Sequence, residues 1–301
     1  MAHFSLPPTL QALQTAVGQA LQPVCLSEAH CWAETRLLLE GIGLSAQDIL
    51  LNPAGSLSDN QRMQLTGFLE RRITGREPVQ YILGRAHFYG LALSVSPAVL
   101  IPRPETETLV EAALAHCQAF PPESDPLRIV DVATGSGAIA LALYHELTQE
   151  MGRSVAMTAT DLSPDALAVA RANAGALGYP VEFYEGDGLG ALSCEATSPR
   201  YHLIVSNPPY VDPVLRETLQ PEVVAHEPAM ALFPPGDRLA FYRRLAEGAR
   251  KLLRPGGALM VEIGDDQGPA VRDIFSASGY QQVRVVPDLA GRDRVVTGIQ
   301  P

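Results

Sequence analysis

The sequence predicts an α/β fold in which a small helical bundle precedes a doubly wound, mostly parallel sheet. Three observations support this prediction. Apolar residues follow helical spacing over residues 1–84, strand-like and helix-like segments alternate over residues 105–301, and two strand-like segments follow one another at the C-terminus. The chain has 301 residues and is 47% hydrophobic, which is enough to fill two cores. We therefore expect two domains.

Helices are expected throughout residues 1–84, where apolar residues recur at helical spacing between Leu10 and Leu21. The residues that would cap the later helices are Ser27, Glu28, Ser45 and Ser58. This segment has neither a glycine-rich loop nor metal-ligand spacing, so we expect a docking or lid module. Residues 85–104 then mix β-favouring residues with Gly90 and three prolines, which predicts a β-hairpin connector.

Strands and helices are expected to alternate through residues 105–301, the larger domain. The expected strands are LRIVDVA, VAMTATD, VEFYEGD, YHLIVSNPP and ALMVEI, followed by QQVRVV and RVVTGI. The expected helices are ETETLVEAALAHC, AIALALYHEL, PDALAVARANAGALG and DRLAFYRRLAEGARKLL, with a last one near residues 270–278. Parallel strands need helical crossovers, so this order predicts a parallel sheet with helices on both faces and one antiparallel hairpin at its C-terminal edge.

The composition excludes several classes of protein. A formal net charge of -11 argues against binding that depends on neutralising many phosphates, so a polypeptide or small-molecule ligand is favoured over direct contact with nucleic acid. The four cysteines, Cys25, Cys31, Cys117 and Cys194, form no Cys-x-x-Cys pair, and we expect neither disulfides nor a metal. The sequence shows no basic leader and no apolar run near the roughly 20 residues of a membrane helix, which predicts a cytoplasmic protein without membrane contact.

A glycine-rich turn follows the strand LRIVDVA. Gly135 and Gly137 lack the Cβ atoms that would block a ligand, and the next helix presents unpaired N–H groups there. The same spacing satisfies the dinucleotide fingerprint, so a nicotinamide enzyme is an alternative. Asp161 ends the next strand, where its carboxylate can bind both ribose hydroxyls of an adenosine or cap the helix that starts near Pro164. Asp187 follows the third strand and could reach the adenine amino edge.

The most specific signal is Asn207-Pro208-Pro209-Tyr210, directly after the strand LIVS. The prolines fix φ and remove backbone donors, so the carbonyls here can face outward as acceptors. Asn207 adds a side-chain carbonyl and Tyr210 an aromatic face. Together they would hold an NH₂ group on a planar π system, such as a glutamine amide or an adenine or cytosine amine. No proton donor or acceptor suited to hydride transfer is evident in this loop, which weakens the nicotinamide alternative.

The glycine turn, Asp161 and this loop resemble the Rossmann-like, S-adenosylmethionine-dependent amino-group methyltransferases. REPVQYILGRAHFYGLALSVSPAVLIPRPETETLVEAAL, VDVATGSGAIALAL and IVSNPPYVD are similar to the bacterial release factor glutamine methyltransferases. This similarity runs from about Arg76 to the C-terminus, and residues 1–84 resemble that family's substrate-docking domain. It implies that S-adenosylmethionine methylates the glutamine side-chain amide in the GGQ motif of peptide chain release factors. We expect the enzyme to be a monomer.

The resemblance also implies the site residues. Those expected to bind S-adenosylmethionine are Asp131, Ala133, Thr134, Gly135, Ser136, Gly137, Asp161, Asp187, Gly188 and Asn207. Asn207 and Pro208 are expected to act in catalysis, and both bind substrate together with Pro209 and Tyr210. Two positions depart from the family's pattern. Ala133 replaces a usual glycine, which is tolerable unless the position needs a positive φ, and Gly188 replaces a bulky residue that often packs near adenine.

An amide nitrogen is a weak nucleophile, so we expect alignment and charge placement to matter more than a general base. A DNA exocyclic-amine (adenine) methyltransferase is the alternative enzyme, but it should show a basic groove and a target-recognition region. A non-catalytic binding module would be expected to have lost Asn207 or the glycines. The charged residues left without an assigned role are Arg103, Glu105, Glu107, His226 and Glu227.

Overall fold

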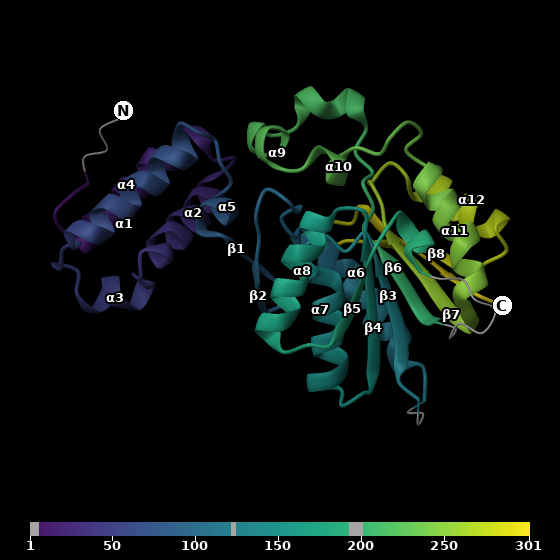
Figure 1. The fold of residues 1–301 in the computed structure, drawn as a ribbon. Coiled ribbons are helices and arrows are strands. Elements are labelled where there is room, and N and C mark those ends of the chain that lie inside the picture. The colour runs from purple at the N-terminus through teal and green to yellow at the C-terminus, as the bar shows by residue number, and fades with distance from the viewer. Residues whose placement is uncertain (1–5, 122–124, 193–200) are drawn as a thin grey trace. The chain divides into compact units, whose positions relative to one another are not determined.

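The computed structural model describes residues 6–121, 125–192 and 201–301 (Figure 1). Cys194 lies outside these residues. Within them, the alternation of strands and helices predicted for the larger domain is confirmed. No helix in the described ranges is both long enough and apolar enough to cross a membrane.

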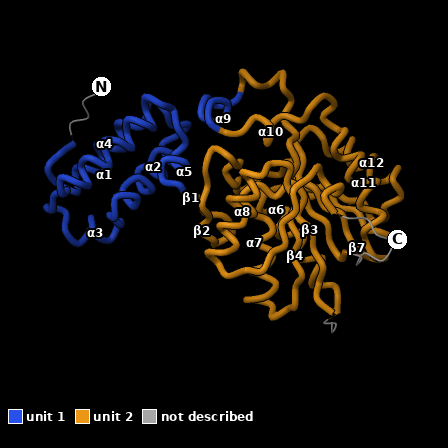
Figure 2. The backbone as a smooth tube through the Cα atoms, viewed as in Figure 1, with its two compact units in different colours: residues 1–85, 219–226 blue, residues 86–218, 227–301 orange. Residues whose placement is uncertain are grey.

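The chain forms two compact units (Figure 2). Residues 1–85 and 219–226 make up the first unit, and residues 86–218 and 227–301 make up the second. The sequence predicts residues 219–226 within the larger domain, yet they cluster with the N-terminal helices. Their apolar run is too short to show helical periodicity, so no sequence signal distinguished them.

Helices α2, α3 and α4 of the first unit begin where Ser27, Ser45 and Ser58 predict, and the unit's described helices are six in all. They are α1 (Leu10–Leu21), α2 (Glu28–Gly41), α3 (Ala46–Leu51), α4 (Asp59–Ile73), α5 (Val79–Leu83) and α9 (Pro221–His226), with a 3-10 turn at Gln22–Val24. Ser27 caps α2, and Ser45 and Ser58 each form a capping box. The apolar faces of the helices meet in one core that includes Leu13, Val17, Leu38 and Leu65.

The first unit also contains a buried ion-pair cluster around Arg72. Arg72 Nε donates to Glu34 Oε2 at 2.8 Å, and Nη1 donates to Glu222 Oε1 at 2.7 Å. Arg76 Nη2 lies 2.8 Å from the same Glu222 oxygen. A buried carboxylate needs such partners, so Glu222 fixes α9 to the N-terminal helices.

The second unit is built on a seven-stranded sheet among the described residues, in the order β5-β4-β3-β6-β7-β9-β8. The strands are β3 (Leu127–Val132), β4 (Val155–Asp161), β5 (Val181–Glu185), β6 (Tyr201–Ser206), β7 (Leu253–Glu262), β8 (Gln281–Pro287) and β9 (Asp293–Ile299). β3 to β7 pair in parallel, while β9 is antiparallel to both β7 and β8. The predicted sheet and its antiparallel edge are therefore confirmed.

Helices cover both faces of this sheet. They are α6 (Glu107–Gln118), α7 (Ala138–His145), α8 (Pro164–Leu177), α11 (Ala240–Leu252) and α12 (Gly268–Ala277), and the short α10 (Ala229–Leu232) precedes α11. Leu203 and Val205 of β6 pack on the face that α6 and α7 cover, whereas Ile204 packs on the face of α11 and α12. Neighbouring strand residues point to opposite faces, so both faces of the central strands are apolar.

The connector and the longer loops differ in detail from the prediction. The hairpin is confirmed but short, with β1 (Arg85–Phe88) and β2 (Leu91–Ser94), and 3-10 turns occur at Pro104–Thr106, Gly188–Ala191 and Pro213–Thr218. The predicted turn PGG lies inside β7, which starts at Leu253. The helix α7 ends earlier than predicted, and a π-helical turn follows it at Glu146–Glu150.

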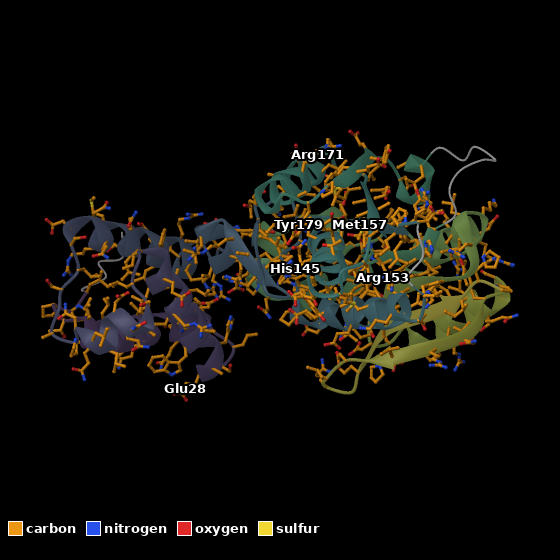
Figure 3. All side chains as sticks on the ribbon, turned by 90° about the horizontal axis from the view of Figure 1, so that it is seen from below. Glu28, His145, Arg153, Met157, Arg171 and Tyr179 are labelled. Atoms are coloured by element: carbon orange, nitrogen blue, oxygen red, sulfur yellow. The ribbon has the colours of Figure 1, made fainter. Side chains whose placement is uncertain are left out.

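Polar contacts join the helices on one face of the sheet. His145 at the end of α7 lies beside Tyr179, just after α8 (Figure 3), with Nδ1 and the tyrosine hydroxyl 2.6 Å apart. Arg153 donates to the Phe120 carbonyl at 3.2 Å, near the end of α6. These contacts fix the C-terminal ends of α6, α7 and α8, which lie at the opposite edge of the sheet from the C-terminal ends of the strands.

Candidate active site

A cavity of about 400 Å³ lies in the second unit, where β3, β4, β5 and β6 end at one edge of the sheet. Ligands bind at this edge in open α/β folds. The predicted site residues that line the cavity are Ala133, Thr134, Gly135, Ser136, Asp161, Asp187, Gly188, Asn207 and Pro209. The structure thus brings together groups from four strand ends, as the sequence predicts.

Four predicted site residues do not line the cavity: Asp131, Gly137, Pro208 and Tyr210. Asp131 is buried below the glycine turn, and Gly137 starts α7. Pro208 is buried, while Tyr210 packs inward against the core between the sheet and α11. The side chains of these four residues lie behind the cavity walls, and Asn207 and Pro209, the two neighbours of Pro208 in the chain, line the cavity.

The glycine turn has the backbone that the spacing predicts. Gly135 and Gly137 have φ angles of 57° and 83°, in the left-handed region that favours glycine. A Cβ on Gly137 would also lie 3.2 Å from Leu141 and 3.3 Å from Ala170. Gly137 therefore permits close packing of α7 against α8, while Gly135 brings the backbone to the cavity.

Ala133 also lies in the left-handed region, with φ of 59°. This is the one condition under which the replacement of glycine was expected to matter. A left-handed conformation costs an L-residue about 1–2 kcal/mol. Ala133 therefore adds strain to the turn, and its methyl group lines the cavity.

Ala133→Gly is expected to raise the free energy of unfolding by about 0.5–1 kcal/mol, because relief of strain exceeds the entropy cost of glycine. The control is Ala115→Gly in α6, where the exposed helical position should lose about 1 kcal/mol. Urea denaturation of both variants measures the difference. Equal losses of stability in the two variants would show that position 133 carries no strain.

Asp131 organises the turn from inside the protein. Its Oδ2 accepts from the Thr134 hydroxyl at 2.5 Å and from the Ala140 N–H at 3.2 Å. Burial raises its pKa to about 7, against the hydrogen bonds from Thr134 and Ala140. Asp131 thus links the end of β3 to the turn and to α7, and the prediction that it binds the cofactor directly is not supported by its position.

The raised pKa of Asp131 predicts a pH-dependent stability. The unfolded carboxyl has a pKa near 4, so between about pH 4 and 7 the folded state binds the proton more tightly. Stability should therefore fall as pH rises through this window, by up to about 1.4 kcal/mol per unit. Asp131→Asn should lose this part of the pH dependence. Urea denaturation at several pH values compares the two proteins, and identical slopes would contradict the expectation.

Asp161 lines the cavity beside the glycine turn. Its Oδ2 accepts from the Gly135 N–H at 2.8 Å, and its Oδ1 accepts from the Ser163 N–H at 2.9 Å. Burial raises the pKa of Asp161, and these backbone hydrogen bonds oppose the shift. The alternative role as helix cap is wrong, because the Ser163 side chain caps α8 by accepting from Ala166.

Asp187 lies at the cavity edge but has a protein partner. Arg244 Nη1 lies 2.6 Å from its Oδ2, and the Arg244 guanidinium stands 5.6 Å from the centre of the Phe241 ring. Gly188 has a φ of 60°, so a bulky residue there would be strained. Phe241 and Leu162 line the cavity and supply apolar surface that position 188 lacks.

The loop after β6 is held from behind by two residues that the sequence did not indicate. Asn207 Nδ2 donates to the Thr106 hydroxyl oxygen at 3.2 Å, and the Tyr210 hydroxyl donates to Glu262 Oε1 at 3.0 Å. Thr106 lies between two charged residues in IPRPETE, and Glu262 ends the apolar strand ALMVEI. Glu262 could have been identified from the sequence as a site residue, because it is a carboxylate at the end of a buried strand.

Of the charged residues without a predicted role, Arg103 and Glu227 form an ion pair, and the Ile101 N–H also donates to Glu227. Arg103 lines the cavity. Glu107 accepts from the Tyr89 N–H at 2.9 Å, which ties α6 to the hairpin. His226 bonds the Gly75 carbonyl within the first unit. Glu105 is exposed.

The cavity fits S-adenosylmethionine. Ala133 and Gly135, which have positive φ angles, bring the backbone of the glycine turn to the cavity. The Asp161 carboxylate beside them suits a ribose, and apolar side chains line the walls. Among the described residues, no group of three or more His, Cys, Asp or Glu side chains could hold a metal ion.

Comparisons with known proteins agree with this geometry. Residues 123–283 match the family described as "Methyltransferase domain", and residues 25–84 match the "PrmC N-terminal domain". A 16S rRNA N2 methyltransferase from T. thermophilus, solved in complex with AdoMet and guanosine, shares the fold with a TM-score of 0.51 at 17% identity, covering 72% of this chain and 50% of that one. The predicted fold and the S-adenosylmethionine cofactor are confirmed.

Two curated relatives share most of the chain. The release factor glutamine methyltransferase of Caulobacter vibrioides is 41% identical over 89% of this chain and 89% of its own. The protein of the same name from Neisseria gonorrhoeae is 41% identical over 88% of this chain and 92% of its own. Both alignments extend well beyond the glycine turn and the Asn-Pro-Pro-Tyr loop. The chain belongs to the release factor glutamine methyltransferase family.

Proposed function

We propose that this enzyme transfers the methyl group of S-adenosylmethionine to the side-chain amide nitrogen of the glutamine in the GGQ motif of peptide chain release factors. The observation that carries the proposal is the orientation of Asn207 at the cavity. Its NH₂ group donates to Thr106, so its carbonyl oxygen is the group left to accept a hydrogen from the substrate. An acceptor there suits an amide NH₂.

The Asn207 oxygen and the Pro208 carbonyl would accept the two hydrogens of the glutamine NH₂. They would hold its nitrogen in line with the sulfonium methyl group and stabilise the positive charge that develops on it. The carbon–sulfur bond breaks as the carbon–nitrogen bond forms, and the methylated amide then loses one proton to water. No general base is required.

The position of Tyr210 supports a structural role in the loop, whereas the sequence predicted that its ring would stack on the substrate. Its hydroxyl donates to Glu262, and its ring packs inward rather than lining the cavity. The hydroxyl is thus occupied, which leaves Asn207 as the side-chain acceptor that the loop offers to the substrate. We infer that Tyr210 and Pro209 fix the shape of the loop, and that Pro209 borders the substrate where it lines the cavity.

We infer that the glycine turn and Asp161 bind the cofactor, with Gly135 and Ser136 near its polar end and the Asp161 carboxylate on its ribose. Both Asp161 oxygens already accept backbone N–H groups, and a carboxylate offers about four acceptor positions in all. Asp187 and Gly188 lie where the adenine would reach, and the Arg244 partner of Asp187 would have to share that carboxylate.

Asp161→Ala should weaken S-adenosylmethionine binding at least tenfold, because hydrogen bonds to a charged acceptor contribute about 1.5–3 kcal/mol each. Calorimetric titration with S-adenosylmethionine measures the change. The control is Asp237→Asn, an exposed carboxylate outside the cavity, which should bind normally. An Asp161→Ala protein with wild-type affinity and an intact fold would rule out the ribose contact.

We propose that residues 1–84 form a substrate-docking domain, residues 85–104 a hairpin connector and residues 105–301 the methyltransferase domain. The match of residues 25–84 to a family-specific N-terminal domain supports the first role. The exposed apolar side chains of Trp32 and Met63 there suit a protein partner. Residues 219–226 belong with the docking domain, because α9 packs in that unit.

One chain supplies every group named here, so we infer that a monomer suffices. Release factors act at the ribosome, which would place the enzyme in the cytoplasm. Labelled S-adenosylmethionine, offered with a release factor fragment and with an adenine-containing DNA duplex in separate reactions, tests the substrate class. Label in the protein supports the proposal, and label in the DNA alone would favour the exocyclic-amine alternative.

A further inference from the structure

Behind the Asn-Pro-Pro-Tyr loop lies a buried polar network that cofactor binding does not explain. Its centre is Glu262, the last residue of β7, which is only 1% exposed. The Tyr210 hydroxyl donates to its Oε1 at 3.0 Å, and the Tyr242 hydroxyl donates to its backbone carbonyl at 3.0 Å. A buried carboxylate is costly unless it is held by such groups.

Thr106 is hydrogen-bonded to the proposed catalytic residue, Asn207. It is 4% exposed, and its oxygen accepts from Asn207 Nδ2 at 3.2 Å. The Thr106 hydroxyl proton needs an acceptor of its own, since buried hydroxyl groups are almost always hydrogen-bonded. Oε2 of Glu262 is one of the buried side-chain atoms that have no hydrogen-bond partner among the described residues, so it has an acceptor position to offer.

Several polar neighbours of Glu262 oppose the effect of its burial. Burial raises the pKa of Glu262 above its ordinary value, while the neighbouring Thr106 and Tyr210 hydroxyls and the positive charge of Arg294 oppose the shift without cancelling it. Arg294 itself donates to the Ile263 carbonyl at 3.2 Å and to Asp288 at 3.1 Å, which holds its charge close to β7. These neighbours favour a carboxylate that accepts hydrogen bonds and donates none.

We propose that Glu262 is a positioning residue for methyl transfer, which orients the Asn207 amide through the Thr106 hydroxyl. This inference rests on the proposed function. Glu262 accepts the hydrogen bond that the Thr106 hydroxyl can donate. Toward Asn207, the Thr106 oxygen can then act only as a hydrogen-bond acceptor. It then selects the NH₂ group of Asn207, and the Asn207 carbonyl must face the cavity.

The orientation matters because the two ends of an asparagine amide differ little in shape and are opposite in hydrogen bonding. With the amide reversed, an NH₂ group would face the NH₂ of the substrate, and neither could accept from the other. The same chain of hydrogen bonds also polarises the Asn207 carbonyl and strengthens it as an acceptor. Glu262 also holds Tyr210, so one side chain fixes both ends of the loop.

Glu262→Gln tests this directly. The glutamine keeps the size of the side chain and an acceptor for Tyr210, but its NH₂ group can donate to Thr106. The Thr106 proton is then free to turn toward Asn207, and the amide can reverse. We expect kcat to fall about tenfold or more, in line with the cost of misplacing a catalytic group, while the Kd of S-adenosylmethionine stays within about twofold.

A structural role alone predicts the opposite pattern. Replacing a buried charge with a neutral side chain of the same size commonly leaves stability unchanged or raises it. If Glu262 serves only the fold, Glu262→Gln should keep wild-type kcat whatever happens to Tm. A wild-type kcat in this variant would overturn the proposal.

Thr106 provides a matched pair of variants. Thr106→Val removes the hydroxyl at constant shape and should lower kcat as Glu262→Gln does, whereas Thr106→Ser keeps the hydroxyl and should be the more active of the two. The double variant Glu262→Gln/Thr106→Val should be no slower than the slower single variant, because both act through Asn207. Independent, multiplying losses would contradict the proposed path.

The side-chain NH₂ signal of Asn207 in a ¹H–¹⁵N spectrum, assigned by its loss in Asn207→Ala, gives a readout that needs no substrate. The proposal predicts that this signal shifts in Glu262→Gln. If the wild-type enzyme failed to methylate a release factor fragment, the proposed function would fall, and this signal would still decide the positioning role. An unchanged signal would overturn it.

Discussion

Asn207→Ala is expected to lower the rate of methyl transfer about 10²- to 10³-fold, the usual cost of removing one preorganised acceptor. We propose the Asn207 carbonyl as the side-chain acceptor for the substrate, because the Asn207 NH₂ group donates to Thr106 and the Tyr210 hydroxyl donates to Glu262. Without it, the glutamine NH₂ lacks one partner as positive charge develops. Single-turnover kinetics with a release factor fragment measure the rate, and calorimetry should show cofactor affinity close to wild type.

Asn207→Asp sharpens this test. It keeps an oxygen toward the cavity but removes the NH₂ group that donates to Thr106. Partial activity would indicate that the acceptor itself matters most, and complete loss would indicate that the Thr106 contact sets the geometry. Near-normal turnover in Asn207→Ala would refute the proposed site.

Arg72→Ala is expected to lower the free energy of unfolding of the first unit by about 3–5 kcal/mol, the usual cost of breaking a buried ion pair. The substitution removes the arginine partner of the buried Glu34 carboxylate, which keeps its contact with His30, and one of the two arginine partners of Glu222. It would thereby loosen α9 from the N-terminal helices. Trp32 is the single tryptophan of the chain and lies in this unit, so its fluorescence during urea denaturation reports on it.

The matched control is Arg36→Ala. Arg36 is largely exposed and lies 3.7 Å from Glu40, so its loss should cost less than about 1 kcal/mol. Equal effects of the two variants would show that burial does not strengthen the Arg72 cluster. The same cluster affects truncation, because removing residues 1–84 would expose α9 and leave Glu222 without both arginine partners.

The sequence predicted the elements that have strong local signals. Ser27, Ser45 and Ser58 start helices, and the alternating strands of the second unit recur at the predicted positions. Capping and periodicity depend on neighbouring residues, so a single sequence contains them. The glycine turn and Asp161 were found for the same reason.

What the sequence missed depends on contacts between distant residues. Thr106 meets Asn207 across 101 positions, and Glu222 meets Arg72 across 150. Neither pairing has a local pattern, since each forms only when the fold brings two elements together. Asp131 also had a local signal at the end of its strand, but its side chain is buried and does not line the cavity.

The most direct test of the central claim is the position of the transferred methyl group. Wild-type enzyme, S-adenosylmethionine and a release factor fragment that contains the GGQ motif are incubated, and the product is fragmented in a mass spectrometer. The account predicts one added methyl group on the side-chain amide of that glutamine, and none when the glutamine is replaced by glutamate. A methyl group on any other residue, or an unmodified fragment beside methylated DNA, would contradict it.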